Sequence, residues 1–195
     1  MDIYLRTERL RLRRFTGQDV DNLFQLNSDP EVMRFINGGK PTPRQLIRDE
    51  IIPFHLGAYR RDSRFGTWAA EAAPTGEFLG WFHFRPGPGE GIDLGYRLRR
   101  AVWNRGYASE GSRALIRKGF TEPGVQRVFA LTMAVNTGSR RVLEKSGLLL
   151  VRTFPHEGSD AVEGSEHGEV EYALTKAEWE ARAAGDHGPG SGESG

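Results

Sequence analysis

Hydrophobic residues recur along this chain with two periods, one typical of strands and the other of helices. Leu10 and Leu12 alternate with arginines, which predicts a strand over residues 10–15 with one face in water. Apolar residues at helical spacing predict a helix over residues 19–27. The chain therefore starts with a strand followed by a helix.

The same pattern, together with Pro and Gly positions, predicts the remaining elements. In order they are a helical turn from Pro30 to Phe35, a helix from Thr42 toward Tyr59 that Pro53 kinks or splits, strands over 65–73, 78–85 and 92–98, a helix ending at Phe120, a strand over 127–133, a helix over 136–146, strands over 148–154 and 170–174, and a short helix that includes Trp179. This order predicts one mixed α/β domain over residues 1–184. Residues 185–195 (GDHGPGSGESG) have nothing to bury and are expected to form a disordered tail.

Composition excludes several classes of protein. The chain has 195 residues, no cysteine and a formal net charge of +1, so disulfides, thiolate metal sites and a cysteine nucleophile are excluded. No apolar run approaches the roughly 18 residues of a membrane span, and no secretory signal is visible. We therefore expect a cytoplasmic protein with no membrane partner and no metal. The small net charge argues against a nucleic-acid partner.

The charges are nevertheless distributed unevenly. Residues 97–118, the cationic segment, contain seven bases and one acid. Residues 156–171, the acidic segment, contain six acids and no Lys or Arg: Glu157, Asp160, Glu163, Glu166, Glu169 and Glu171. One segment could bind a polyanion and the other a cation, and the alternative is that both are solvated surface.

The most informative stretch is the predicted turn between the strand at 92–98 and the helix ending at Phe120. A glycine-bearing turn that opens a helix points unpaired amides at one spot, and the helix dipole adds positive charge there. Gly106 lets the backbone approach a ligand closely, and nearby arginines favour a pyrophosphate. The alternative is an ordinary capped connection. Neither a Walker loop nor a G-x-G-x-x-G fingerprint is present.

Two motifs give the chain a family resemblance. Residues 103–111 (WNRGYASEG) resemble the acetyl-CoA motif of the GNAT N-acetyltransferase superfamily, in particular its RimJ/RimL-like branch, although Asn104 replaces a glycine often found there. Residues 136–147 (NTGSRRVLEKSG) resemble a second segment of that branch, and the opening residues 5–14 resemble its first strand. The resemblance implies a mixed, mostly antiparallel central sheet with helices on both faces.

The resemblance also implies where acetyl-CoA binds. In this family it lies between two splayed parallel strands, here residues 92–98 and 127–133. The implied cofactor-binding residues are Leu98, Trp103, Asn104, Arg105, Gly106, Tyr107, Ala108, Ser109, Asn136 and Ser139. The Leu98 N–H would polarise the acetyl carbonyl, and Ser139 would protonate the leaving thiolate. The alternatives are that Asn136 only caps a helix and that Ser139 is a first-turn serine.

The sequence offers three candidates for the base that takes a proton from the attacking amine. A glutamate that some relatives carry on the fifth strand is replaced here by Leu131. Glu71, His83 and Asp93 remain as candidates, and Asp93 is chosen with Ser139 as the catalytic pair because it lies on the strand leading to the turn. The alternatives are a solvated strand residue for Asp93 and a structural histidine for His83.

These observations predict an N-acetyltransferase that moves an acetyl group from acetyl-CoA directly to a primary amine, because no cysteine can hold an acyl intermediate. The acceptor is expected to be a protein N-terminus or a small cationic amine that the acidic segment attracts. The alternatives are an acyltransferase for another acyl-CoA, or a CoA-binding regulatory module without catalysis. A homodimer is left open.

Overall fold

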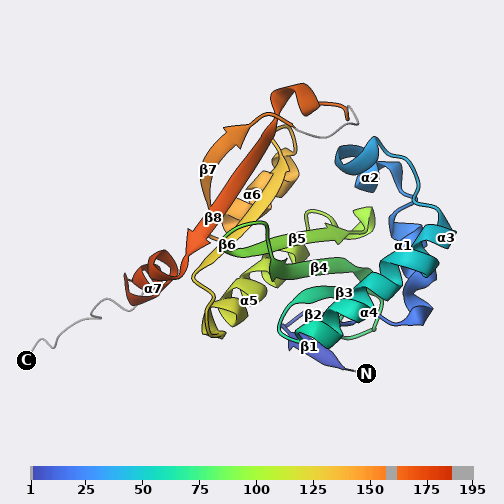
Figure 1. The fold of residues 1–195 in the computed structure, drawn as a ribbon, viewed down its shortest axis with the longest axis horizontal. Coiled ribbons are helices and arrows are strands. Elements are labelled where there is room, and N and C mark those ends of the chain that lie inside the picture. Colours follow the sequence, from blue (N-terminus) through green and yellow to red (C-terminus); the bar gives the residue numbers. More distant parts are fainter. Residues whose placement is uncertain (1, 157–161, 186–195) are drawn as a thin grey trace, which may run out of the picture.

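The computed structural model describes residues 2–156 and 162–185, which form a single eight-stranded mixed sheet (Figure 1). The strands lie in the order β1-β2-β3-β4-β5-β6-β8-β7. Their bounds are β1 Ile3–Arg6, β2 Leu10–Arg14, β3 Gly66–Ala72, β4 Phe78–Pro86, β5 Ile92–Leu98, β6 Arg127–Met133, β7 Leu149–Phe154 and β8 Glu169–Thr175. All neighbours are antiparallel except β5 and β6.

Helices cover both faces of the sheet. The bounds of the described α-helices are α1 Val20–Leu26, α2 Pro30–Asn37, α3 Arg44–Leu46, α4 Ile52–Arg61, α5 Tyr107–Thr121, α6 Thr137–Lys145 and α7 Lys176–Gly185. One apolar core joins α5 and α6 to the sheet, and a second joins α1, α2 and α4 to the opposite face, where Ala69, Phe78 and Trp81 pack. Within the described ranges, no helix has both the length and the apolar character needed to cross a membrane.

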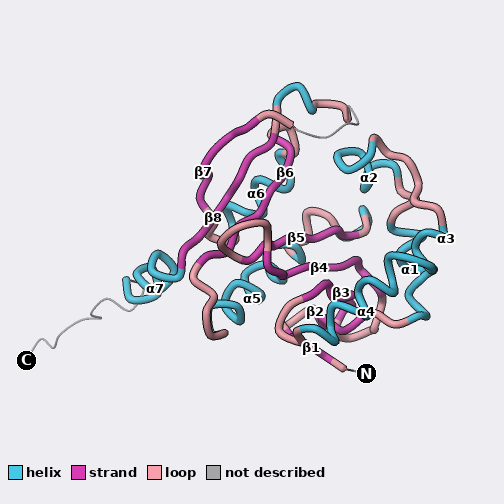
Figure 2. Tube along the Cα trace, viewed as in Figure 1, coloured by secondary structure: helices cyan, strands magenta, loops and turns pink. Residues whose placement is uncertain are grey.

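The parallel strands β5 and β6 separate soon after they begin. Their register contains only the pairs Ile92 with Val128 and Asp93 with Phe129. Beyond Asp93 the two strands diverge, as Figure 2 shows, so the rest of β5 is paired with β4 alone. The predicted splay between residues 92–98 and 127–133 is therefore confirmed, and it leaves an open strand edge in the middle of the sheet.

The structure corrects the sequence prediction in two places. Residues 3–6 form an additional strand, β1, which pairs with β2. The helix expected from Thr42 toward Tyr59 is divided by a π-helical turn, Ile47–Ile51, and Pro53 lies in the first turn of α4 that follows. A proline lacks an N–H, and the π-helical turn directly before it interrupts the α-helical bonding pattern at this point. Of the predicted tail, Gly185 ends α7, and residues 186–195 lie outside the described part.

Two glycines let α5 lie unusually close to β4. A Cβ at Gly111 would overlap the Phe82 ring, and one at Gly119 would overlap the Phe84 ring. Both rings are fully buried. The glycines therefore fix the depth at which α5 lies on the sheet, and with it the position of the helix N-terminus.

Replacing Gly111 with alanine is expected to destabilise the folded protein by about 1–3 kcal/mol, because the new methyl group overpacks the core. Denaturant unfolding measures the change. The matched control is Gly57→Ala in α4, where an added Cβ finds only ordinary contacts at 3.7 Å. That variant is expected to gain about 0.5–1 kcal/mol from helix propensity. Equal effects in the two helices would contradict the close packing of α5 on β4.

Candidate active site

The turn before α5 has the shape of an anion cradle. Asn104 and Gly106 both adopt positive φ, at 58° and 81°, and Gly106 is the N-cap residue of α5. Among the described residues, no side chain caps this helix end. The first amides of a 15-residue helix, from Tyr107 to Ser109, therefore lack a side-chain acceptor. Ser109 is buried, so it can contribute through its amide.

Arg9, which sequence analysis did not single out, holds this turn in place. Its Nη1 donates to the Arg105 carbonyl over 2.9 Å, and its guanidinium lies 4.7 Å from the centre of the Tyr107 ring. It also pairs with Glu110 over 2.6 Å. Burial acts to raise the pKa of Glu110, but bonds from Thr7 and Arg9 outweigh it and lower that pKa. The N-terminal strands are thus tied to the first turn of α5.

Leu98 and Trp103 lie where the open edge of β5 meets this turn. Arg99 N donates to Leu79 O in β4 over 2.8 Å. Because successive strand amides alternate in direction, the Leu98 N–H points away from β4, toward the open edge. The Trp103 indole N–H donates to the Leu98 carbonyl over 2.8 Å, so this side chain ties the turn to the strand.

The structure places Ser139 beside the tyrosine of β5. Asn136 Oδ1 accepts a bond from Ser139 N over 3.1 Å, which confirms the predicted cap of α6. Ser139 Oγ lies 3.1 Å from the Tyr96 hydroxyl. Burial raises the pKa of Tyr96 to about 12 despite this contact. The Tyr96 side chain thus spans from β5 to α6 across the opening between the parallel strands.

Two of the three candidate bases form one cluster on the opposite face of the sheet. His83 Nε2 lies 3.1 Å from Asp93 Oδ2, and Arg85 Nε lies 3.6 Å from the same oxygen. The His83 ring lies flat over Gly95, where a Cβ would come within 2.5 Å of it. Burial acts to raise the pKa of Asp93, but His83 and Arg85 lower it overall. The carboxylate is therefore ionised at neutral pH and suited to orienting His83.

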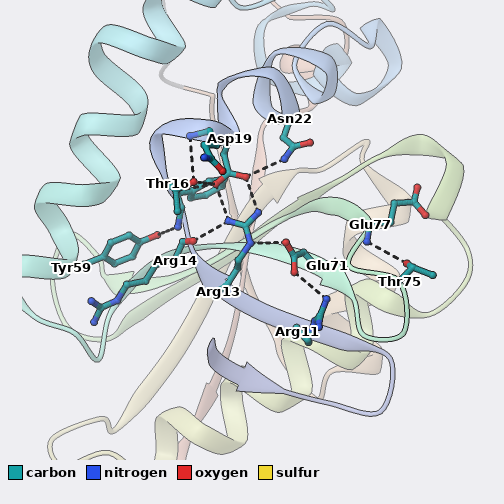
Figure 3. A network of polar contacts seen from close by, with 12 residues as sticks. Arg11, Arg13, Arg14, Thr16, Asp19, Asn22, Tyr59, Glu71, Thr75 and Glu77 are labelled. Atoms are coloured by element: carbon teal, nitrogen blue, oxygen red, sulfur yellow. Dashed lines mark hydrogen bonds and ion pairs between the residues drawn. The ribbon is translucent and has the colours of Figure 1, made fainter. Parts of the chain in front are cut away.

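The third candidate base, Glu71, lies in a separate cluster of ion pairs. It is buried and bonded to Arg13 over 2.6 Å, with Arg11 at 3.4 Å (Figure 3). Its carboxylate is thus already paired with two guanidinium groups. This pairing with arginines on β2 counts against Glu71 as the base, because a neutralised carboxylate attracts a proton weakly.

The acidic segment is partly paired with basic side chains in the fold. Glu163 forms a two-bond pair with Arg34, Glu169 pairs with His156, and Glu171 pairs with both Arg127 and Arg152. Glu166 lies 3.5 Å from His167. Glu157 and Asp160 lie outside the described residues. Arginines therefore neutralise Glu163 and Glu171, whereas Glu166 and Glu169 contact histidines, which carry a charge only when protonated.

The site as a whole fits a long ligand with a pyrophosphate at one end. The uncapped amides and the exposed Arg105 suit the phosphates, and the open edge of β5 offers amides to an extended chain. That chain would run past Leu98 toward Tyr96 and Ser139, and Asp93 lies further along β5, where β5 and β6 meet. The predicted binding residues of the turn, Leu98, Asn136 and Ser139 thus surround one opening, while Asp93 lies at its closed end.

Comparisons with known proteins agree with this geometry. The sequence profile of the acetyltransferase (GNAT) domain family matches residues 9–149. The chain is 34% identical over 187 residues to the FsC-acetyl coenzyme A-N(2)-transacetylase of Aspergillus fumigatus, covering 90% of this chain and 77% of that protein. Its fold matches a GNAT acetyltransferase of Bacillus anthracis with a TM-score of 0.75, at 26% identity and covering 91% and 99% of the two chains. The RimL ribosomal-protein α-N-acetyltransferase, solved with coenzyme A, has the same fold, with a TM-score of 0.76, 17% identity and 89% and 98% coverage.

Proposed function

Since the chain belongs to the GNAT acetyltransferase family and is an acyl-CoA-dependent acyltransferase, we propose that it transfers the acetyl group of acetyl-CoA to a primary amine. The amine belongs to a peptide N-terminus or to a small cationic molecule. The observation that carries the proposal is the splay of β5 from β6, which ends against the uncapped N-terminus of α5. The homodimer and the cytoplasmic location stay predictions.

Acetyl-CoA supplies an activated thioester, and the protein supplies position and proton transfer. The amides of residues 106–109 and Arg105 hold the pyrophosphate, and Asn136 contacts the pantetheine arm. The Leu98 N–H, directed into the opening, binds the carbonyl oxygen and stabilises the charge that develops there. Holding amine and thioester together accounts for much of the rate.

Two protons must move as the C–N bond forms and the C–S bond breaks. We assign removal of the amine proton to Nδ1 of His83, because the other ring nitrogen, Nε2, lies 3.1 Å from Asp93 Oδ2. The leaving thiolate takes a proton from Ser139 Oγ, the Tyr96 hydroxyl passes its proton to Ser139, and Tyr96 regains a proton from water before the next turnover. Asp93 and Tyr96 are thus positioning residues, and Ser139 and His83 touch the reacting groups.

The direct test is incubation of the purified protein with acetyl-CoA and a panel of primary amines, with acetylated products identified by mass spectrometry. The proposal expects an acetylated amine and one equivalent of free CoA thiol. Transfer from another acyl-CoA but not from acetyl-CoA would favour the first alternative. Binding of CoA without any amine acetylation would favour the regulatory module.

Replacing Tyr96 with phenylalanine is expected to lower kcat by about tenfold to a hundredfold, because Ser139 loses its proton source. The KM for acetyl-CoA is expected to change little, since the turn is untouched. Steady-state kinetics measure both. The control is Tyr4→Phe, whose hydroxyl donates to Arg64 O far from the opening. An unchanged kcat in the Tyr96 variant would show that Ser139 acts without it.

A further inference from the structure

Arg97 has an unusual environment for an arginine of this chain. It lies on β5 one residue before Leu98, and its guanidinium packs 5.1 Å from the centre of the Trp81 ring. Its Nη1 donates to Asn27 Oδ1 over 2.7 Å, at the end of α1. Its Nε is buried and has no hydrogen-bond partner among the described residues.

The surroundings leave this positive charge uncompensated. Burial lowers the pKa of Arg97 to about 10, with no carboxylate contributing. Arg13 and Arg127, by contrast, each contact a carboxylate. Asp93 is the acid on the same face of β5, but it lies four residues, or about 13 Å, along the strand and is engaged by His83 and Arg85. A partly buried cation without an anion costs free energy that an incoming anion would recover.

The Arg97 side chain points to the face of the sheet from which the acceptor amine would enter the opening. Alternation along β5 sends Tyr96 toward α6, where its hydroxyl meets Ser139. Arg97 points to the other face, toward Asn27 and the helices α1 and α2. If the thioester lies along the open edge on the α5 side, the amine approaches from the face that carries His83, Asp93 and Arg97.

Resting on the proposed function, we propose that Arg97 binds a carboxylate of the acceptor, so the natural substrate is a small amine that also carries a carboxylate. The acceptor would lie with its carboxylate at Arg97 and its amine toward His83. The Trp81 ring under the guanidinium holds Arg97 in the orientation needed for this contact. A simple polyamine would leave the arginine unpaired.

The test compares two pairs of probes that differ only in the carboxylate: L-lysine with cadaverine, and L-phenylalanine with 2-phenylethylamine. Calorimetric titration of each probe into the complex with CoA, which lacks an acyl group, measures binding without turnover. The wild type is expected to bind the carboxylate member of at least one pair about tenfold or more tightly. The Arg97→Gln variant is expected to lose this preference, and Arg97→Lys to keep part of it.

The matched control is Arg99→Gln, because Arg99 also contacts α1, through Gln25 Oε1 over 2.9 Å. It should keep the carboxylate preference. Equal affinity within both pairs in the wild type, or a preference that survives Arg97→Gln, overturns the proposal. A carboxylate preference without acetyl transfer to any probe would support the Arg97 site and count against the proposed function.

Discussion

Replacing Arg13 with leucine is expected to destabilise the folded protein by about 3–5 kcal/mol, because it leaves the buried Asp19 without a cationic partner and Glu71 with only the 3.4 Å contact to Arg11. Arg13 donates to both oxygens of Asp19 over 2.8 Å and to Glu71 over 2.6 Å (Figure 3). All three side chains are at most 7% exposed. The ion pairs join β2 to β3 and to the turn before α1. Denaturant unfolding at neutral pH measures the effect.

The effect of this substitution should depend on pH in a defined direction. Burial acts to raise the pKa of Asp19, but bonds from Arg13, Thr16 and Asn22 lower it overall. A lowered folded-state pKa gives stability that is present above the unfolded value of about 4 and is lost as pH falls through the folded value. Without Arg13, burial favours the protonated form of Asp19, so acid pH neutralises this carboxylate. The stability difference between variant and wild type should therefore shrink toward pH 4.

The adjacent arginine provides the control. Arg14 pairs with Asp2 over 3.2 Å, but these side chains are 39% and 66% exposed. Exposed pairs contribute little, so Arg14→Leu should change stability by about 1 kcal/mol or less. Similar losses for the two variants would contradict the special role of the buried cluster.

The second large effect is expected at Gly106. Valine there would force a β-branched residue into φ 81° and place its side chain against Arg9 and the amides of α5. Losing two amide bonds to a charged phosphate costs about 3–6 kcal/mol, which corresponds to a rise of a hundredfold or more in the Kd for CoA. Calorimetric titration of CoA measures this change.

Two controls separate ligand binding from backbone strain. Gly124→Val places the same residue at φ 84° after α5, with nothing within 4 Å, and should leave the affinity for CoA unchanged. S-acetylpantetheine lacks the pyrophosphate and should react equally with wild type and the Gly106 variant. A Kd for CoA that Gly106→Val does not change would show that the phosphates bind elsewhere.

Local sequence signals predicted most of the fold and the turn. Two-residue alternation identified β2 through β6, and Gly106 marked the start of α5 because a glycine before a helical pattern is a local feature. The strand β1 was missed because four residues give too little alternation to detect. The parallel splay followed from the family resemblance and is confirmed by the register of β5 and β6.

The contacts that complete the site could not be predicted in the same way. Arg9 meets Glu110 across 101 positions, Arg97 meets Asn27 across 70, and Tyr96 meets Ser139 across 43. Such pairs depend on how strands and helices pack, and no local sequence pattern indicates them. The ion pairs of the acidic segment could not be predicted for the same reason, since its partners Arg34 and Arg127 lie far away in the sequence.

We propose that CoA binds along the open edge of β5 with its phosphates at the N-terminus of α5. Amide hydrogen exchange of the wild-type protein, with and without CoA, tests this most directly. The account predicts slower exchange at Leu98 and over residues 106–109, with no change in β3, Gly66–Ala72. Binding of CoA without protection at Leu98 and the α5 turn, or with protection confined to other elements, would contradict it.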